Sequence, residues 1–278
     1  MRKRNLTAVP VLVILCAGLF NTDTAAGQET GIYKHTAVVC AHPEAAKVGV
    51  DIMKRGGNAV DAAIAVQFAL AVVYPNAGNI GGGGFMVYRG KNGDTDALDY
   101  REKAPEKASR DMYLDDKGNP ITDKSLLGAL ACGVPGTVAG MIRAYDKYGK
   151  LKWKNDIQPA IDLAEKGFPV TARQAAELNK IKEGFLKYNR RPTAFVKETP
   201  WAEGDLLKQP ELAATLKLIR DKGRAGFYEG PVAAAIVTSM AHTAGVITEA
   251  DLKNYEAVWR KPVSGRYKGY KVISMPPP

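Results

Sequence analysis

Residues 56–73 read GGNAVDAAIAVQFALAVV, and this stretch decides the fold. Asn58 is a residue type that favours the N-cap of a helix. From Ala59 to Val73 the only polar side chains are Asp61 and Gln67. A helix that is apolar on nearly every face is buried on most of its faces. The stretch therefore predicts a buried core helix over residues 59–73.

The residues on either side of this helix predict a strand, a first helix and a hairpin. The apolar, β-branched run Thr36–Cys40 is typical of a strand, and apolar residues recur at helical spacing between Ala45 and Met53. Downstream, Phe85–Arg89 and Thr95–Arg101 read as two strands. The Asn-Gly pair at 92–93, in the short loop between them, is a strong hairpin signal.

Further helices follow, and glycines or helix-opening prolines mark most of their ends. The segment from Ala104 to Pro135 is rich in turn residues and predicts an irregular stretch along the surface. The predicted helices cover residues 137–148, 157–166, 171–188, 211–222 and 232–244. Val258–Tyr267 and Tyr270–Ser274 predict a second hairpin. Two hairpins with helices between them indicate an α+β fold, in which helices are layered against a mainly antiparallel sheet.

The first 26 residues have the pattern of a secretory signal. A basic start, Arg2-Lys3-Arg4, precedes the apolar run from Ala8 to Phe20 and the small residues Thr24-Ala25-Ala26. The apolar run is shorter than the roughly 20 residues that a membrane-spanning helix requires. We therefore expect residues 1–26 to be a signal peptide, residues 27–278 to form one exported domain, periplasmic or extracellular, and no stable membrane insertion.

Composition and charge narrow the class of protein further. The chain is 46% hydrophobic and 24% charged, which is typical of a globular protein, and its net charge is +10. The basic residues are spread along the chain without interleaved aromatic residues, so they indicate a solvated surface and no nucleic-acid partner. Three histidines without ligand spacing indicate no metal. Cys40 and Cys132 are interpreted as small buried apolar residues, although whether they pair stays open.

Two segments are candidates for binding chemistry. Arg101 stands at the end of the second strand of the first hairpin, where a guanidinium can bind a carboxylate through two hydrogen bonds. From the residues alone, an exposed arginine paired to Asp99 or Glu102 is favoured. The run Gly81–Gly84 offers backbone N–H groups for an anion, but no lysine or helix follows it as in a phosphate-binding loop. A tight passage of the loop against the buried helix is the favoured interpretation. No serine or cysteine has the context of a nucleophile.

Taken together, six blocks of the chain resemble the γ-glutamyltranspeptidase (glutathione hydrolase) family. The blocks run in order from about residue 32 to the last residue: 39–43 (VCAHP), 56–65 (GGNAVDAAIA), 81–85 (GGGGF), 98–105 (LDYREKAP), 133–140 (GVPGTVAG) and 270–278 (YKVISMPPP). The resemblance implies a four-layer αββα sandwich of the N-terminal-nucleophile hydrolases. It also implies a secreted precursor that cuts itself into a large and a small subunit, and a small-subunit threonine that attacks the γ-glutamyl amide.

The resemblance also implies a role for Arg101. At this position the family binds the α-carboxylate of the γ-glutamyl substrate, which reverses the preference for a merely exposed arginine. The nucleophilic threonine of the family lies beyond the position of Pro278, so no catalytic residue is assigned to this chain, and no cofactor or metal is expected. We expect a partner small subunit from the same precursor, an incomplete core, and no activity of this chain alone. The alternatives are a non-catalytic remnant or carboxylate-binding module, and a related acylase acting on cephalosporin side chains or poly-γ-glutamate.

Overall fold

The computed structural model describes residues 35–189, 191 and 193–278, and its compact unit runs from Thr36 to Pro278. The predicted signal peptide, residues 1–26, lies outside the described residues. Within the described ranges, no helix is both long enough and apolar enough to cross a membrane.

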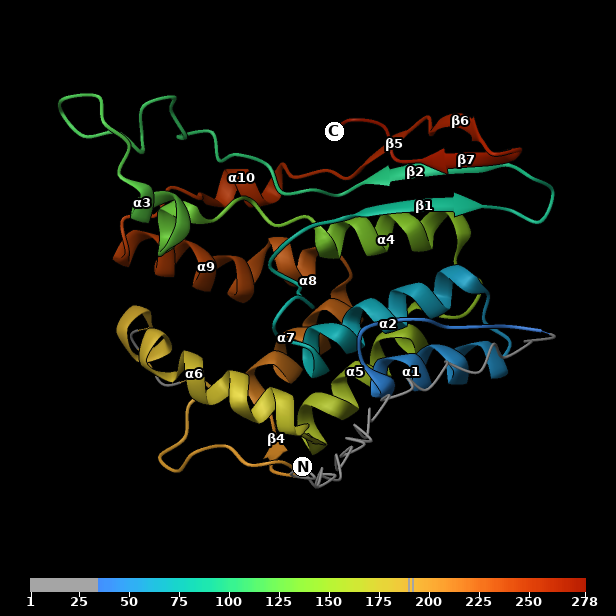
Figure 1. Ribbon diagram of the computed structural model, residues 1–278, viewed down its shortest axis with the longest axis horizontal. Coiled ribbons are helices and arrows are strands. Elements are labelled where there is room, and N and C mark those ends of the chain that lie inside the picture. Colours follow the sequence, from blue (N-terminus) through green and yellow to red (C-terminus); the bar gives the residue numbers. More distant parts are fainter. Residues whose placement is uncertain (1–34, 190, 192) are drawn as a thin grey trace, which may run out of the picture. The chain divides into compact units, whose positions relative to one another are not determined.

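The structure is a mixture of helices and short antiparallel strands, so the predicted α+β class is confirmed (Figure 1). The helices are α1 (Pro43–Lys54), α2 (Ala59–Val73), α3 (Thr122–Leu126), α4 (Thr137–Tyr148), α5 (Trp153–Lys166), α6 (Ala172–Tyr188), α7 (Pro210–Lys222), α8 (Ala225–Tyr228), α9 (Gly230–His242) and α10 (Glu249–Lys253). The strands are β1 (Phe85–Arg89), β2 (Thr95–Asp99), β3 (Phe168–Pro169), β4 (Leu206–Leu207), β5 (Val258–Arg260), β6 (Val263–Tyr267) and β7 (Tyr270–Ser274).

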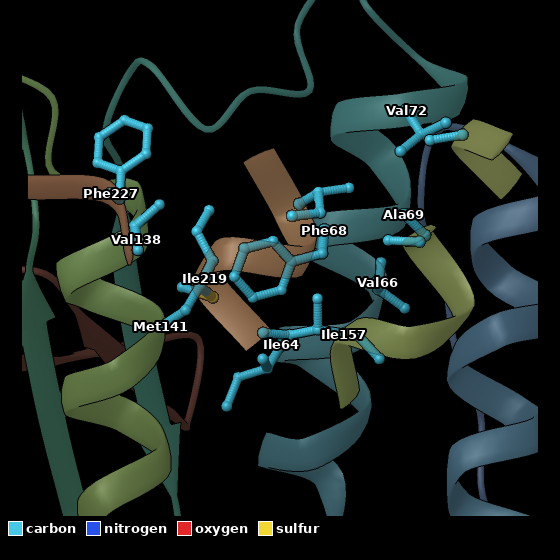
Figure 2. Close-up of a cluster of buried hydrophobic side chains, with 14 of the residues drawn as sticks. Ile64, Val66, Phe68, Ala69, Val72, Val138, Met141, Ile157, Ile219 and Phe227 are labelled. Atoms are coloured by element: carbon cyan, nitrogen blue, oxygen red, sulfur yellow. The ribbon is translucent and has the colours of Figure 1, made fainter. Parts of the chain in front are cut away.

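Helix α2 is the buried core helix that the sequence predicts. Its N-terminus is closed by a capping box, in which the Asn58 side chain accepts from backbone N–H groups of the first turn and Asp61 accepts from the Asn58 N–H. Eleven of its residues are buried, which explains why its apolar side chains are not confined to one face. Figure 2 shows Phe68 of α2 pointing toward Met141 of α4 and Ile219 of α7.

Helix α2 lies at the centre of the helical core. Helices α1 and α5 both pack against α2, and α7 packs against α5. Helix α4 contacts α2 as well as strand β2, so it connects the helical core to the sheet (Figure 1). This arrangement fixes the position of β2, whose last residues lead into the candidate site.

Strands β1, β2 and β5 form an antiparallel sheet with β2 in the centre. In its register, Phe85 lies opposite Asp99, and Asp99 and Ala97 lie opposite Val258 and Arg260. The first hairpin therefore forms, but its second strand ends at Asp99, two residues before the predicted end at Arg101. Two further pairs, β3–β4 and β6–β7, complete the strands of the described residues.

The structure corrects four details of the predicted elements. Thr36–Cys40 is not a strand, because no described strand pairs with it, and Val39 is 95% exposed. The predicted strand 258–267 is interrupted at Lys261-Pro262, where proline lacks the N–H that a ladder needs, so β5 pairs with β2 while β6 pairs with β7. Helix α5 begins four residues earlier than predicted, at Trp153. The segment 104–135 contains α3 and one 3-10 turn.

A buried carboxylate on α5 is not stabilised by any hydrogen bond that the structure describes. Both side-chain oxygens of Asp156 are buried without a partner, whereas Asp61 accepts from the backbone N–H of Asn58 at 2.7 Å and that of Lys150 at 2.8 Å. Burial, together with the nearby charge of Asp61, raises the pKa of Asp156 to about 7. The folded chain therefore holds a protonated carboxyl at acidic pH.

This carboxyl predicts a specific dependence of stability on pH. Because the pKa of Asp156 is raised in the folded state, the unfolded chain ionises first, and stability is lost as the pH rises from about 4 to about 7. In Asp156→Asn this part of the dependence should be absent, as measured by urea unfolding at pH 5 and pH 8. The exposed Glu183→Gln is the control and should keep the wild-type dependence. An identical dependence in the wild type and Asp156→Asn would contradict the assignment.

Candidate functional site

The residues after β2 are held in place by close contacts between Tyr100 and glycines. Gly84 and Tyr100 exchange two backbone hydrogen bonds, of 3.2 and 3.0 Å. A Cβ atom added to Gly83 would lie 2.5 Å from the Tyr100 carbonyl oxygen, and one added to Gly140 would lie 2.3 Å from the Tyr100 ring. Side chains at these positions would collide with Tyr100, whose burial raises its pKa to about 12. The glycines therefore allow the chain to approach Tyr100 from two sides.

The glycine loop itself is fixed by hydrogen bonds inside the protein. Asn79 Oδ1 accepts from the Gly82 N–H at 2.9 Å and from the Thr137 hydroxyl at 2.7 Å. The Gly82 carbonyl accepts from the N–H groups of Gly136 and Thr137. Because the N–H groups of Gly82 and Gly84 are both used within the chain, the four-glycine run does not form a free anion nest. The prediction of a tight passage is right, but at Gly83 and Gly84 the neighbour is Tyr100 and not the buried helix.

Arg101 has a fixed backbone and an exposed side chain. Its N–H donates to Asp99 Oδ1 at 3.0 Å, and its carbonyl accepts from the Tyr255 hydroxyl at 2.7 Å. Among the described residues, the Arg101 side chain makes no ion pair with Asp99, Glu102 or any other carboxylate. A guanidinium without a partner on an anchored backbone is suited to bind an external carboxylate.

A cavity of about 350 Å³ lies beside this guanidinium. It is lined by residues from the end of β2, from the segment before β5, from β5 itself and from the last residue of the chain: Asp99, Arg101, Glu102, Lys103, Tyr255, Glu256, Val258, Arg260 and Pro278. The lining combines cationic and anionic side chains with few apolar ones, which is suited to a small zwitterionic ligand.

Asp99 is engaged by a different arginine. Its Oδ2 accepts from Arg260 Nε at 2.8 Å, and the Asp99 side chain is only 9% exposed. One carboxylate therefore accepts from the Arg101 backbone through Oδ1 and from the Arg260 side chain through Oδ2. Asp99 serves as a shared acceptor between β2 and β5.

Tyr255 is held by stacking and by burial. Its ring stacks on that of Tyr228 with centroids 6.0 Å apart, and the Tyr228 hydroxyl donates to the Pro135 carbonyl at 2.8 Å. Burial raises the pKa of both tyrosines, so both hydroxyls remain protonated donors. The sequence indicated Arg101 as the candidate and Asp99 only as its possible ion-pair partner, whereas in the structure Asp99 pairs with Arg260. The sequence carried no signal for Tyr255 or Arg260, because both reach the site from distant parts of the chain.

The remaining candidate residues lie outside the cavity. Among the described residues, no group of three or more His, Cys, Asp or Glu side chains could hold a metal ion. His42 caps α1, accepting from the Glu44 N–H at 3.3 Å, and burial lowers its pKa. Cys40 and Cys132 are free thiols. The expectation that both are buried is wrong, because Cys132 is exposed and Cys40 is partly buried.

Comparison with known proteins shows the family to which this chain belongs. A family model described as gamma-glutamyltranspeptidase matches residues 45–278. The glutathione hydrolase proenzyme of Escherichia coli is 50% identical over 247 residues, which are 88% of this chain and 43% of that protein. The crystal structure of Helicobacter pylori gamma-glutamyltranspeptidase matches with a TM-score of 0.86 at 49% identity, covering 89% of this chain and 71% of that chain.

A more distant structure shares the fold. Cephalosporin acylase from Bacillus halodurans matches with a TM-score of 0.73 at 27% identity, covering 88% of this chain and 49% of that chain. The chain belongs to the gamma-glutamyltranspeptidase family. It spans less than half the length of the E. coli proenzyme.

The contact between Tyr100 and Gly140 gives a prediction with an internal control. Gly140→Ala places a methyl group against the Tyr100 ring and should lower the free energy of unfolding by about 1–3 kcal/mol. Gly184 lies in α6 with no neighbouring atom within 4 Å of an added Cβ, so Gly184→Ala should raise stability by about 0.5–1 kcal/mol. Both are measured by urea unfolding. Equal effects of the two substitutions would show that Tyr100 does not constrain Gly140.

Proposed function

We propose that this chain supplies the carboxylate-binding part of a γ-glutamyltransferase (glutathione hydrolase). The observation that carries the proposal is the exposed Arg101 guanidinium beside the 350 Å³ cavity. This guanidinium has no ion-pair partner among the described residues. Its planar fork matches the α-carboxylate of a γ-glutamyl group through two parallel hydrogen bonds. Family membership supports γ-glutamyl amides such as glutathione as the substrate class.

Arg101 would act by orienting the substrate. In the proposed reaction, a threonine at the start of the small subunit attacks the γ-carbonyl carbon, its hydroxyl proton passes to its own α-amine, and the amine product leaves with a proton. The resulting γ-glutamyl ester is then cleaved by water, giving glutamate, or by the amine of an amino acid, giving a new γ-glutamyl amide. A ligand held by its α-carboxylate presents the γ-carbonyl at a fixed distance from Arg101, which lowers the entropic cost of the attack.

The proposal includes a second subunit from the same precursor and an αββα sandwich. Phe85 and Val87 on β1 are 43% and 44% exposed, and Tyr270 on β7 is 76% exposed. Exposed apolar side chains on strands are suited to pack against further strands. The proposed export of the protein rests on the pattern of residues 1–26 alone.

A related acylase is the second candidate, and the similarity to the B. halodurans cephalosporin acylase favours it as the alternative. The two activities differ in what the cavity must recognise. A γ-glutamyl donor requires its α-carboxylate, whereas an acylase of other side chains accepts donors that lack an α-amino acid group. Comparison of γ-glutamyl and glutaryl anilides therefore separates the two candidates.

Substitution of Arg101 tests the proposed role directly. In the complete processed enzyme, Arg101→Ala should raise KM for a γ-glutamyl anilide by roughly a hundredfold, because two charge-assisted hydrogen bonds are lost, while self-cleavage proceeds normally. Arg101→Lys should recover part of the loss, since lysine offers only a point charge. An unchanged KM in Arg101→Ala would remove Arg101 from the substrate site.

The chain by itself gives a separate prediction. The resemblance to the family assigns the nucleophilic threonine to the small subunit, so the purified 278-residue chain should release no product from a γ-glutamyl anilide above the rate of the buffer. The measurement is the absorbance of the released aniline. Release at a rate typical of an enzyme would show that the chain carries its own nucleophile and would contradict the proposed division of roles.

A further inference from the structure

Three carboxylates line the cavity beside Arg101, and each competes in principle with a substrate for its guanidinium. They are Asp99, Glu102 and Glu256. Asp99 is the one tied to Arg101, because its Oδ1 accepts from the Arg101 N–H at 3.0 Å. Both residues line the same cavity, and a largely buried carboxylate attracts a guanidinium within reach more strongly than an exposed one does, because the surrounding dielectric is lower. A feature of the site must therefore prevent an ion pair between the Arg101 guanidinium and the Asp99 carboxylate.

Arg260 is the cationic partner of the Asp99 carboxylate. Its Nε donates to Asp99 Oδ2 at 2.8 Å, from the neighbouring strand β5. With Oδ1 engaged by the Arg101 backbone and Oδ2 by Arg260, both oxygens of Asp99 already accept hydrogen bonds, and its charge is balanced. The remaining cationic group of the lining, Lys103, lies over the Tyr255 ring at 5.1 Å and forms no ion pair within the described residues.

We infer that Arg260 is a positioning residue that occupies Asp99 and thereby keeps the Arg101 guanidinium free to bind the substrate carboxylate. The inference rests on the proposed function for its consequence in catalysis, but the pairing itself is a property of this chain. Without Arg260, the unbalanced charge of Asp99 draws in the Arg101 side chain, and a substrate must displace that ion pair before it binds. The energetic penalty then appears in substrate binding and not in the chemical step.

The freedom of the Arg101 guanidinium is measurable in the 278-residue chain without activity. Phenylglyoxal modifies arginines whose guanidinium groups are accessible and unpaired, and peptide mass spectrometry resolves the rate at each arginine. Arg260→Gln should slow the modification of Arg101 about tenfold, the factor expected when one charge-assisted pair forms. Arg55, an exposed arginine at the end of α1, serves as the internal control and should react at the same rate in every variant.

A second substitution distinguishes positioning from a merely structural role. Asp99→Asn removes the competing charge but keeps an oxygen that can accept from the Arg101 N–H. In the Arg260→Gln background, Asp99→Asn should therefore restore the rate of Arg101 modification to within about twofold of the wild type. If Arg260 only stabilised the sheet, the additional substitution of Asp99 would not restore the rate of Arg101 modification.

Arg260→Lys provides the same test with a milder change. Lysine weakens the pair without removing the charge, so the modification of Arg101 should slow by less, and Asp99→Asn should again restore it. This series carries the test if Arg260→Gln does not fold, as judged by circular dichroism. Modification of Arg101 that is unaffected by both Arg260 substitutions, or that stays slow after Asp99→Asn, would overturn the inference.

In the complete processed enzyme, the same variants should change KM and leave kcat nearly unchanged. Arg260→Gln should raise KM for a γ-glutamyl anilide about tenfold with kcat within about twofold, and Asp99→Asn in that background should lower KM again. A fall in kcat with KM unchanged would contradict the inference. The Arg101→Ala variant separates a failure of the proposed function from a failure of the inference about Arg260. If its KM is unchanged, the proposed function fails, whereas the modification rates still decide whether Arg260 keeps Arg101 free.

Discussion

The site depends on the close approach of backbone to Tyr100. This residue follows the central strand β2, and glycines on two segments leave the space that its ring and carbonyl occupy. One segment is the loop ending at Gly84, which pairs with Tyr100 through the backbone, and the other contains Gly140 of α4. Since α4 also packs on the buried helix α2, the core and the end of β2 are linked through this contact. Arg101 is the next residue, so its backbone position follows from the same constraint.

The Arg101 side chain is exposed and forms no ion pair with any described residue. The Asp99 carboxylate accepts from the Arg101 N–H and the Tyr255 hydroxyl donates to the Arg101 carbonyl, so both backbone polar groups of Arg101 are held, and Asp99 also accepts from Arg260. A cation left without a partner is costly where it is buried, but Arg101 is exposed, so water solvates it until a ligand arrives. In the proposed function, the anchored backbone reduces the conformational freedom that Arg101 loses when it binds a carboxylate.

Local signals predicted the helices well and the contacts of the site poorly. The capping residues Asn58 and Thr171 and the glycine after Tyr148 placed α2, α6 and α4 correctly, because helix ends are determined by neighbouring residues. The predicted strand at Thr36–Cys40 failed because strands need a partner that local sequence does not specify. Arg260 lies 161 residues from Asp99 along the chain, and no local pattern joins the two. The resemblance to a family supplied the role of Arg101, which its own surroundings in the sequence did not favour.

The central claim is that Arg101 binds the α-carboxylate of a γ-glutamyl group in the cavity that residues after β2 and residues of β5 line. The most direct measurement is a crystal structure of the complete processed enzyme with bound L-glutamate. The account predicts that the glutamate α-carboxylate accepts two hydrogen bonds from the Arg101 guanidinium while Asp99 remains paired with Arg260. A glutamate bound elsewhere, with the Arg101 guanidinium paired to Asp99, would contradict it.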